Sequence, residues 1–318
     1  MPPGSTVPVY AGVTGPFPRP EELVQATRDL DRGRIAPADG DAAFARADAA
    51  VAAVEERLRL DVRTGGYLRW DDLFRPFTRL WDGASPGPLT RFFETNTFYR
   101  QPVLTHRPKG GSGRLANWLP SPLPGARAIL PGPYTFSTMA EVAFPGRGEK
   151  PIEQIAEAIA AEIRALGAGR PAQWQFQEPM LVYAPPTDDG ESVVRAYRTI
   201  AEAAPSTPKI VWTYFGDAAR TMPLLARLPV DGVGFDLFET DPGATEPLRN
   251  KAIGLGCLDA RSTVPESVPD VARLVREVIR IGRPSSVWLG PSPPLDLLPF
   301  DAAVRKLEVL PPLREALR

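Results

Sequence analysis

The sequence predicts an α/β protein built as a closed (β/α)8 barrel, and three observations support that prediction. Short runs of β-branched and aromatic residues alternate with longer helical segments almost to the end of the chain. These runs number eight, which fits a closed barrel better than an open sheet. The 318 residues, 43% of them apolar, suffice for one large barrel or two smaller domains, and no linker rich in Gly, Ser or Pro marks a boundary.

The expected strands and helices follow from local patterns. Ile152, Ile155 and Ile159 recur at helical spacing behind Pro151, which predicts a helix over 151–166. A second helix is expected from Val268 to Gly282, because Arg283-Pro284 follows. The strands are expected, in chain order, at residues 7–13, 58–64, 126–130, 173–177, 209–214, 232–237, 252–258 and 286–289.

Residues 80–124 break the alternation. They contain WDGASPGP, then RFFETNTFYRQPVLTHRP, and then the glycine-rich KGGSGR. A connection longer than about 12–15 residues is more often functional than decorative. We therefore expect a single barrel domain over residues 1–318 with an excursion at about 80–124, a hairpin or a lid.

Composition excludes several classes of function. One cysteine allows no internal disulfide, and one histidine allows no multi-histidine metal site. A net charge of -1 gives no electrostatic footprint for nucleic acid or for a membrane surface. The start of the chain has neither the basic nor the apolar region of a secretory signal. These features predict a cytoplasmic protein whose ligand is a small molecule.

Polar residues follow most of the expected strands. In a (β/α)8 barrel the active site lies at the carboxyl ends of the strands, so these residues are its candidates. They include carboxylates and arginines, the usual groups of acid–base chemistry, and Glu178 behind an apolar strand is expected to have a raised pKa. For any single residue, a structural ion pair explains the pattern slightly better than catalysis; for the whole cluster, a binding site explains it better.

The order of these strand ends resembles that of the cobalamin-independent methionine synthase family, in particular its C-terminal catalytic barrel and its short single-barrel form. The resemblance extends from Thr14 to about Leu295, and RFFETNTFYRQP, GPYT and QFQEP are its most specific segments. It implies a TIM barrel of the methionine synthase and uroporphyrinogen decarboxylase type. It also implies a methyltransferase that takes its methyl group from methyltetrahydrofolate.

The chain departs from the family at the zinc ligands. The family holds zinc through the His and Cys of an H-x-C motif, a later glutamate and a final cysteine; the matching positions here are Trp212, Tyr214, Asp236 and Pro293. Soft sulfur ligands hold the zinc that activates the thiol acceptor, and one aspartate does not replace them. Pro16, Gly66 and Gln177 also stand where the family has a serine, a glutamate and an aspartate. We therefore expect no zinc site.

His106 and Cys257 fall outside these positions, so a rebuilt zinc site is disfavoured. An oxygen-ligand cation site from Asp71, Asp72, Asp217 and Asp236 stays open. No cofactor is certain; a folate or a corrinoid is the expected methyl donor. The predicted catalytic residues are Glu178, Asp236, Tyr214 and Asp217, and the predicted substrate-binding residues are Arg19, Arg69, Asp71, Asn96, Tyr99, Gln177 and Trp212.

Four functions remain open. The favoured one is a methyltransferase barrel that binds a methyl donor without zinc-activated thiol chemistry. The second is a metal-free decarboxylase-like enzyme on a polycarboxylate, suggested by the pair Arg19 and Arg69. The third is a non-catalytic barrel that acts as a partner of another protein or as a sensor. A protein partner or a homo-oligomer is also an open prediction. The fourth is methionine synthase activity itself, which the missing ligands oppose.

Overall fold

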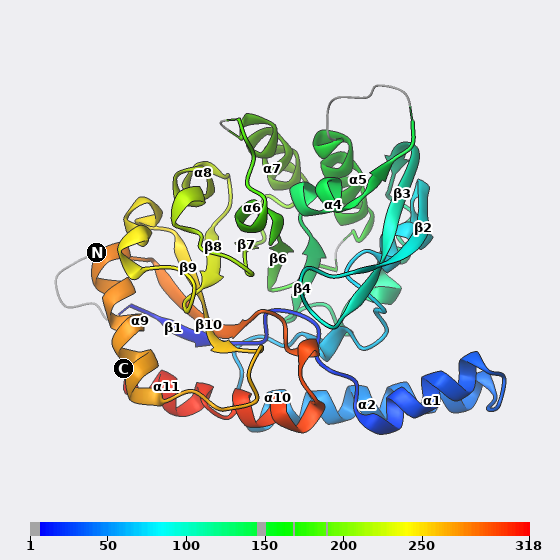
Figure 1. Cartoon of the computed structure of the whole chain (residues 1–318), viewed down its shortest axis with the longest axis horizontal. Helices are drawn as coiled ribbons and strands as arrows, with labels where there is room; N and C mark the ends of the chain where they lie inside the picture. The colour runs from blue at the N-terminus through cyan, green and yellow to red at the C-terminus, as the bar shows by residue number, and fades with distance from the viewer. Residues whose placement is uncertain (1–6, 145–150, 168, 189) are drawn as a thin grey trace.

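The computed structural model describes residues 7–144, 151–167, 169–188 and 190–318, and its centre is a curved parallel sheet. Seven strands lie in the order β1-β10-β9-β8-β7-β6-β4, all parallel (Figure 1). These strands are β1 (Val9–Ala11), β4 (Arg127–Pro131), β6 (Gln173–Gln177), β7 (Lys209–Trp212), β8 (Gly232–Asp236), β9 (Ala252–Asp259) and β10 (Ser286–Ser292).

Two single bridges close this sheet into a ring. Gly12 pairs with Val62 and Arg63 pairs with Ala126, both in the parallel sense. Residues 62–63 thus fill the gap between β1 and β4 as an eighth, two-residue strand. The predicted (β/α)8 barrel is confirmed, although the second strand is much shorter than the expected 58–64. The reason is that the preceding helix continues to Arg57, and Arg59 then turns the chain through a left-handed φ of 50°.

Helices surround the sheet and bury its outer face (Figure 1). The two predicted helices are confirmed as α5 (Ile152–Ala165) and α9 (Val268–Gly282). Within the described residues, no helix has the length and apolar character needed to cross a membrane. The other helices are α1 (Glu21–Asp31), α2 (Pro37–Arg57), α3 (Arg75–Leu80), α4 (Pro133–Met139), α6 (Met180–Tyr183), α7 (Glu191–Ala203), α8 (Met222–Arg227), α10 (Phe300–Leu307) and α11 (Leu310–Ala316).

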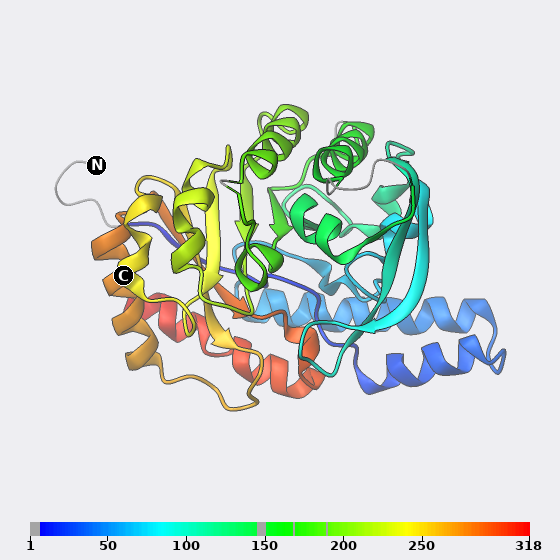
Figure 2. The same cartoon turned by 45° about the horizontal axis from the view of Figure 1, so that its top comes forward.

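The segment between the second strand and β4 does not form one long helix. It contains the short α3 and then an antiparallel hairpin of β2 (Asp82–Arg91) and β3 (Phe98–Lys109). The short strand β5 (Glu141–Val142) adds to β3 and completes a second, three-stranded sheet. Figure 2 shows this hairpin curving along one flank of the barrel, beside α5. Residues 92–97 form the turn of the hairpin, and Phe92 and Thr97 of this turn lie at the barrel mouth.

The interior of the barrel is filled by an indole ring. Ile210 and Trp212 of β7, with Tyr214 two residues beyond its end, form a core cluster of their own, apart from the core under the helices. A Cβ atom at Gly234 or Gly254, on the next two strands, would lie 2.2 or 2.3 Å from the Trp212 ring. The ring therefore lies flat over two glycines and closes the barrel below its mouth.

Candidate active site at the barrel mouth

A cavity of 140 Å³ lies at the carboxyl ends of the strands, between the barrel and the turn of the β2–β3 hairpin. Its walls combine aromatic rings with carboxylates, as ligand sites commonly do. The side chains that the argument below uses are Trp70, Asp71, Phe92, Tyr99, Gln177, Tyr214, Phe215 and Asp296.

Aromatic rings from the hairpin form the roof of this cavity. The Phe92 ring lies 5.8 Å from Tyr99 and 6.2 Å from Phe215, centroid to centroid. The neighbouring Phe93 contacts Phe215 at 4.8 Å and Tyr183 of α6 at 4.9 Å. These edge and tilted contacts are the favourable geometries for aromatic pairs. The hairpin turn is therefore fastened across the mouth by rings from both sides.

Asp296 is one of the carboxylates that line the cavity. It lies in the turn Leu295–Leu297, just beyond β10, and its side chain is open to solvent on the cavity side. The loss of water on its other sides raises the pKa of Asp296 to about 7, against a usual value of 3.8. Burial raises the pKa of the Tyr214 phenol well above 10, and the nearby Asp296 charge raises it further. At neutral pH the cavity therefore offers a titrating carboxyl beside a neutral phenol.

Asp236 lies at the end of β8 in a separate polar cluster. Its side chain accepts hydrogen bonds from the Phe238 amide at 2.9 Å and the Ser292 hydroxyl at 3.2 Å, and it pairs with Arg261 at 3.4 Å. Burial raises its pKa to about 6, although the Arg261 charge opposes the rise. Arg261 also pairs with Asp259 at 2.7 Å and with Glu239 at 2.5 Å. The cluster is held together from three strand ends but does not line the 140 Å³ cavity.

Glu178 does not face the mouth, contrary to the prediction. Its carboxylate accepts hydrogen bonds from the amides of Tyr134 at 3.0 Å and Thr135 at 2.7 Å, in the first turn of α4. The Tyr197 hydroxyl of α7 donates a third bond at 3.0 Å. The side chain is fully buried, and this burial raises its pKa to about 7. Glu178 thus joins the barrel wall to two helices behind it.

Three of the predicted binding residues, Asp71, Tyr99 and Gln177, line the mouth cavity together with the predicted catalytic Tyr214. Asp71 is held by ion pairs to Arg19, Arg75 and Arg79. Gln177 donates to the Thr14 carbonyl at 2.5 Å, which ties the floor of the mouth to the first strand. These four residues therefore line the same cavity, and their binding and catalytic roles stay predictions.

The other predicted residues lie elsewhere. Arg19 and Arg69 stack on Phe44, with their guanidinium carbons 5.8 and 4.4 Å from its ring centre, outside the mouth cavity. Asp217 is exposed and accepts a bond from the Ala219 amide at 2.8 Å, and Asn96 is exposed in the hairpin turn. Trp212 lies below the mouth as part of the core.

Asp296 and Arg261 were missing from the predicted site. Asp296 lies four residues beyond the last residue of β10, after Pro293-Pro294-Leu295. The strand-end rule, which considers the residues directly after a strand, does not include it. Arg261 stands in the segment that follows β9, but nothing in its local sequence shows that it would meet Asp236 from another strand. The sequence shows where Asp296 and Arg261 stand relative to the strands, but it does not show which residues of other strands they contact.

The positions that match the family's zinc ligands do not fit zinc. The indole of Trp212 has no lone pair to donate and occupies the interior, and Pro293 has no donor in its side chain. Among the residues that the structure describes, no three His, Cys, Asp or Glu side chains come close enough to share a metal ion. His106 lies on the hairpin, 3.2 Å from Asp82, and Cys257 is buried in β9 with its pKa raised to about 12 by that burial.

The fold and the mouth define a (β/α)8 barrel with a polar opening at the carboxyl ends of its strands, lined on one side by the β2–β3 hairpin. The sequence model of the family described as "Cobalamin-independent synthase, N-terminal domain" matches residues 47–280. Because this match covers more than half of the chain, the chain belongs to the cobalamin-independent synthase family. The family prediction is confirmed, and the matching description names the N-terminal domain where the motifs had pointed to the C-terminal barrel.

Relatives of two lengths are similar to the chain. A methionine synthase of Sulfolobus acidocaldarius is 25% identical over 304 residues, covering 93% of this chain and 88% of that protein. A 5-methyltetrahydropteroyltriglutamate–homocysteine methyltransferase of Mycobacterium tuberculosis H37Rv is 34% identical over 197 residues, which is 57% of this chain. The chain matches about a quarter of the length of that mycobacterial protein, 25%.

Solved structures confirm the fold. A B12-independent methionine synthase from Shewanella sp. W3-18-1, in complex with selenomethionine, superposes with a TM-score of 0.78 at 14% identity, covering 98% of this chain and 97% of that one. A protein from Listeria monocytogenes described as a B12-independent methionine synthase gives a TM-score of 0.73 at 16% identity, with 98% of both chains covered. At these identities the likeness extends to the fold alone.

Proposed function

We propose that this chain is a methyltransferase-type barrel that binds a methyl donor in the mouth cavity and works without a zinc-activated thiol. The observation that carries the proposal is the cavity itself, a space between aromatic rings with one titrating carboxyl, Asp296. Membership of a family whose relatives are named methyltransferases supports the reaction class.

The size of the cavity favours methyltetrahydrofolate over a methylcorrinoid. A closed volume of about 150 Å³ holds a ring of benzene size. The 140 Å³ mouth cavity can therefore enclose part of a planar pterin, and the rest of the ligand can leave by the open side. A corrin macrocycle is several times larger and would have to displace the hairpin turn.

Three residues would orient such a ligand. The Tyr99 and Trp70 rings give it an apolar surface, and a carboxylate at Asp296 can accept hydrogen bonds from the amine and ring N–H groups of a pterin. The hairpin turn, held by Phe92 and Phe93, would exclude water from the bound ring. The chain itself supplies these binding and orienting roles, and the acceptor of the methyl group stays undefined.

Binding of 5-methyltetrahydrofolate, measured by calorimetry, tests the proposal, with methylcobalamin measured in parallel. Saturable binding of the folate that the Asp296→Asn variant weakens is the expected result. Absence of binding at millimolar concentrations of both donors would overturn it. Metal analysis of protein prepared without chelators tests the zinc-free part, which stoichiometric, tightly held zinc would contradict.

Neither arginine that suggested a polycarboxylate substrate lines the mouth. Arg19 donates to the Leu68 carbonyl at 2.8 Å and pairs with Asp71 at 3.2 Å, and Arg69 pairs with Asp41 at 3.5 Å. A decarboxylase-like reaction on a polycarboxylate therefore lacks the cationic cluster it needs at this cavity. The sensor hypothesis has no observation of its own in its favour.

A further inference from the structure

Arg19 and Arg69, the two arginines that the sequence suggested for an anionic ligand, lie outside the mouth cavity and meet in a second cleft. This arginine cleft has a volume of 480 Å³, and its walls include residues of α1, α2 and α3. Asp71 lines both the arginine cleft and the mouth cavity, so the two are neighbours.

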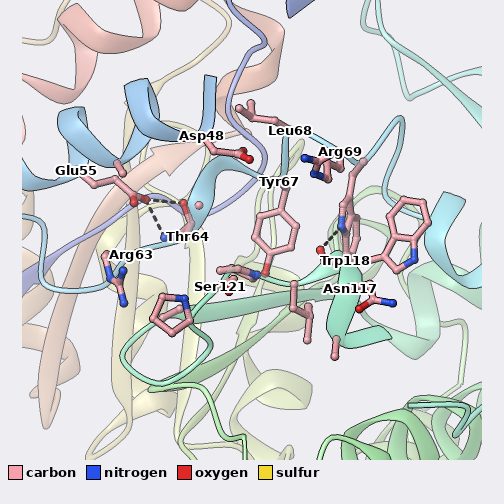
Figure 3. Close-up of a pocket in the computed structure, with 18 residues that line it drawn as sticks. Asp48, Glu55, Arg63, Thr64, Tyr67, Leu68, Arg69, Asn117, Trp118 and Ser121 are labelled. Carbon is pink, nitrogen blue, oxygen red and sulfur yellow. Dashed lines mark hydrogen bonds between the residues drawn. The ribbon is translucent and has the colours of Figure 1, made fainter. Parts of the chain in front are cut away.

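The arginine cleft also borders the outer wall of the barrel. Arg69, Asn117 and Trp118 line it together with a further cleft of 380 Å³ on that wall. Figure 3 draws this further cleft and shows the three side chains on the side that lies away from Glu55. The Trp118 ring therefore offers an apolar surface at the edge of the arginine cleft.

Three guanidinium groups converge in the arginine cleft. Arg19 and Arg69 both lie over the Phe44 ring, with their guanidinium carbons 5.8 and 4.4 Å from its centre. Arg19 and Arg79 both pair with the Asp71 carboxylate, at 3.2 and 3.6 Å. The three positive charges are thus gathered about one ring and one carboxylate.

The ion pairs around Asp71 leave one positive charge without a carboxylate. Asp71 pairs with Arg75 at 3.2 Å as well as with Arg19 and Arg79. Asp72 supplies a second carboxylate, which pairs with Arg75 at 2.8 Å. Three arginines therefore share two carboxylates, and an anion in the cleft would balance the third arginine.

The other charges of the cleft do not remove this excess. Asp41 pairs with Arg69 at 3.5 Å and balances its charge. Arg28 and Asp31, both exposed on α1, add one charge of each sign. The lining therefore keeps one positive charge in excess after each paired arginine is set against its own carboxylate.

All three guanidinium groups keep hydrogen-bond donors for a ligand. Arg19 is fixed in place by its Nε, which donates to the Leu68 carbonyl at 2.8 Å, while its Nη1 has no acceptor among the residues that the structure describes. In the same part of the chain, Arg69 donates through Nη1 alone. The 3.6 Å contact of Arg79 with Asp71 is longer than a hydrogen bond. Since a guanidinium has five N–H donors, each of the three can bind an oxygen of a ligand.

We propose that the arginine cleft binds the phosphate group of a small phosphate ester. A phosphate ester has three free oxygens, one for each of Arg19, Arg69 and Arg79, whereas a carboxylate has two. Its charge of about -1.5 to -2 at neutral pH matches the positive excess of the cleft better than the single charge of a carboxylate. The organic part of the ester lies against the Trp118 ring.

Calorimetric titration with glycerol 3-phosphate tests this proposal. Inorganic phosphate measures the phosphate group alone, and glycerate replaces the phosphate by a carboxylate. At constant ionic strength we expect glycerol 3-phosphate to bind with a millimolar or lower Kd and glycerate to bind at least about tenfold more weakly. Equal affinities for glycerol 3-phosphate and glycerate would overturn the proposal, as would the absence of binding by both phosphate compounds.

Matched variants locate the site. Arg69→Gln and Arg79→Gln should each weaken binding of glycerol 3-phosphate about tenfold, because each removes one cation from the cleft. Arg249→Gln is the control, since Arg249 is as exposed as Arg69 and is also paired with one carboxylate, and it should leave the affinity unchanged. Equal effects of Arg69→Gln and Arg249→Gln would contradict the assignment.

A variant of the mouth separates this site from the proposed methyl-donor site. Asp296 lines the mouth cavity but not the arginine cleft, so Asp296→Asn should leave the affinity for glycerol 3-phosphate unchanged. A change of tenfold or more in that variant would place the phosphate in the mouth cavity and overturn the proposal. The outcome does not depend on whether 5-methyltetrahydrofolate binds.

Discussion

The mouth end of the barrel has two polar regions that differ in how far the protein itself satisfies their carboxylates. Behind the wall, Glu178 accepts three hydrogen bonds from α4 and α7 and has no access to solvent. In the mouth, Asp296 is open to the cavity, and its own backbone amide is the one donor to its carboxylate among the residues that the structure describes. Both have a pKa of about 7 for the same reason, loss of water. A raised pKa alone therefore does not separate these two carboxylates, while the number of donors that the fold fixes on each of them does.

The largest effect on the free energy of unfolding is expected at the buried Glu178. Glu178→Ala would remove the buried acceptor to which the Tyr134 amide, the Thr135 amide and the Tyr197 hydroxyl donate. Each unsatisfied buried donor costs about 1–3 kcal/mol, so the free energy of unfolding should fall by at least about 3 kcal/mol. Urea denaturation measures the change. Glu202→Ala, on the exposed side of α7, is the control and should change stability by less than about 0.5 kcal/mol.

The next largest effect on stability is expected at the contact between Gly254 and the Trp212 ring, below the mouth. A Cβ atom at Gly254 would lie 2.3 Å from the Trp212 ring, so Gly254→Ala should lower the free energy of unfolding by about 1–3 kcal/mol. If the ring is the main cause, the alanine should cost less once Trp212→Leu has removed the ring, and the remaining cost should come from the Gly234 Cα atom, 2.9 Å from the added Cβ. A double-mutant cycle measures this coupling. Equal costs in the two backgrounds would show that Trp212 does not fill the barrel as described.

The regular half of the barrel was predictable from local sequence, and the irregular half was not. The strand β6 begins and ends where the pattern QWQFQ predicts, because both faces of a parallel strand are buried and the run is bounded by Pro171 and Pro179. The second strand was predicted over 58–64 but pairs through Val62 and Arg63 alone. Its apolar residues continue those of α2, and no local signal separates the end of that helix from the start of a strand.

The candidate site shows the same limit. The strand-end rule placed Tyr214 and Gln177 near one another, since the fold alone determines which ends meet, and Tyr99 entered the prediction with the segment RFFETNTFYRQP. It placed Glu178 in the mouth as well, because the sequence does not show which side of a strand end a side chain leaves from. The direction of Glu178 depends on the first turn of α4, whose amides attract the carboxylate. That contact joins residues 43 apart, beyond any local pattern.

A smaller effect on stability is expected at the ion pair between Arg261 and Asp236, at the end of β8. Arg261→Gln removes the cation beside Asp236, whose side chain is buried, so the pKa of Asp236 should rise above about 6. Because Arg261 is a third exposed, we expect a loss of about 1 kcal/mol in the free energy of unfolding. The loss should be larger at pH 8, where Asp236 is ionised, than at pH 5, where it is protonated in the folded protein. Arg249→Gln, in an exposed pair with Glu246, should show no such pH dependence.

The smallest effect on stability, and the prediction that bears most directly on function, concerns Asp296. If the ionised carboxylate accepts hydrogen bonds from the methyl donor, affinity should rise with pH as Asp296 loses its proton around pH 7. Between pH 6 and pH 8 the ionised fraction of a group with a pKa of about 7 increases about tenfold, and the affinity for 5-methyltetrahydrofolate should increase by the same factor. Asp296→Asn should give a flat profile at the weaker level, while its stability stays close to that of the unaltered chain because no fixed donor loses its acceptor. Calorimetry across this pH range measures both profiles. If the Asp296→Asn variant keeps the pH dependence, another group titrates in this range, and Asp236 is the next carboxyl to replace. That outcome would contradict the difference in role between the buried Glu178 and the open Asp296.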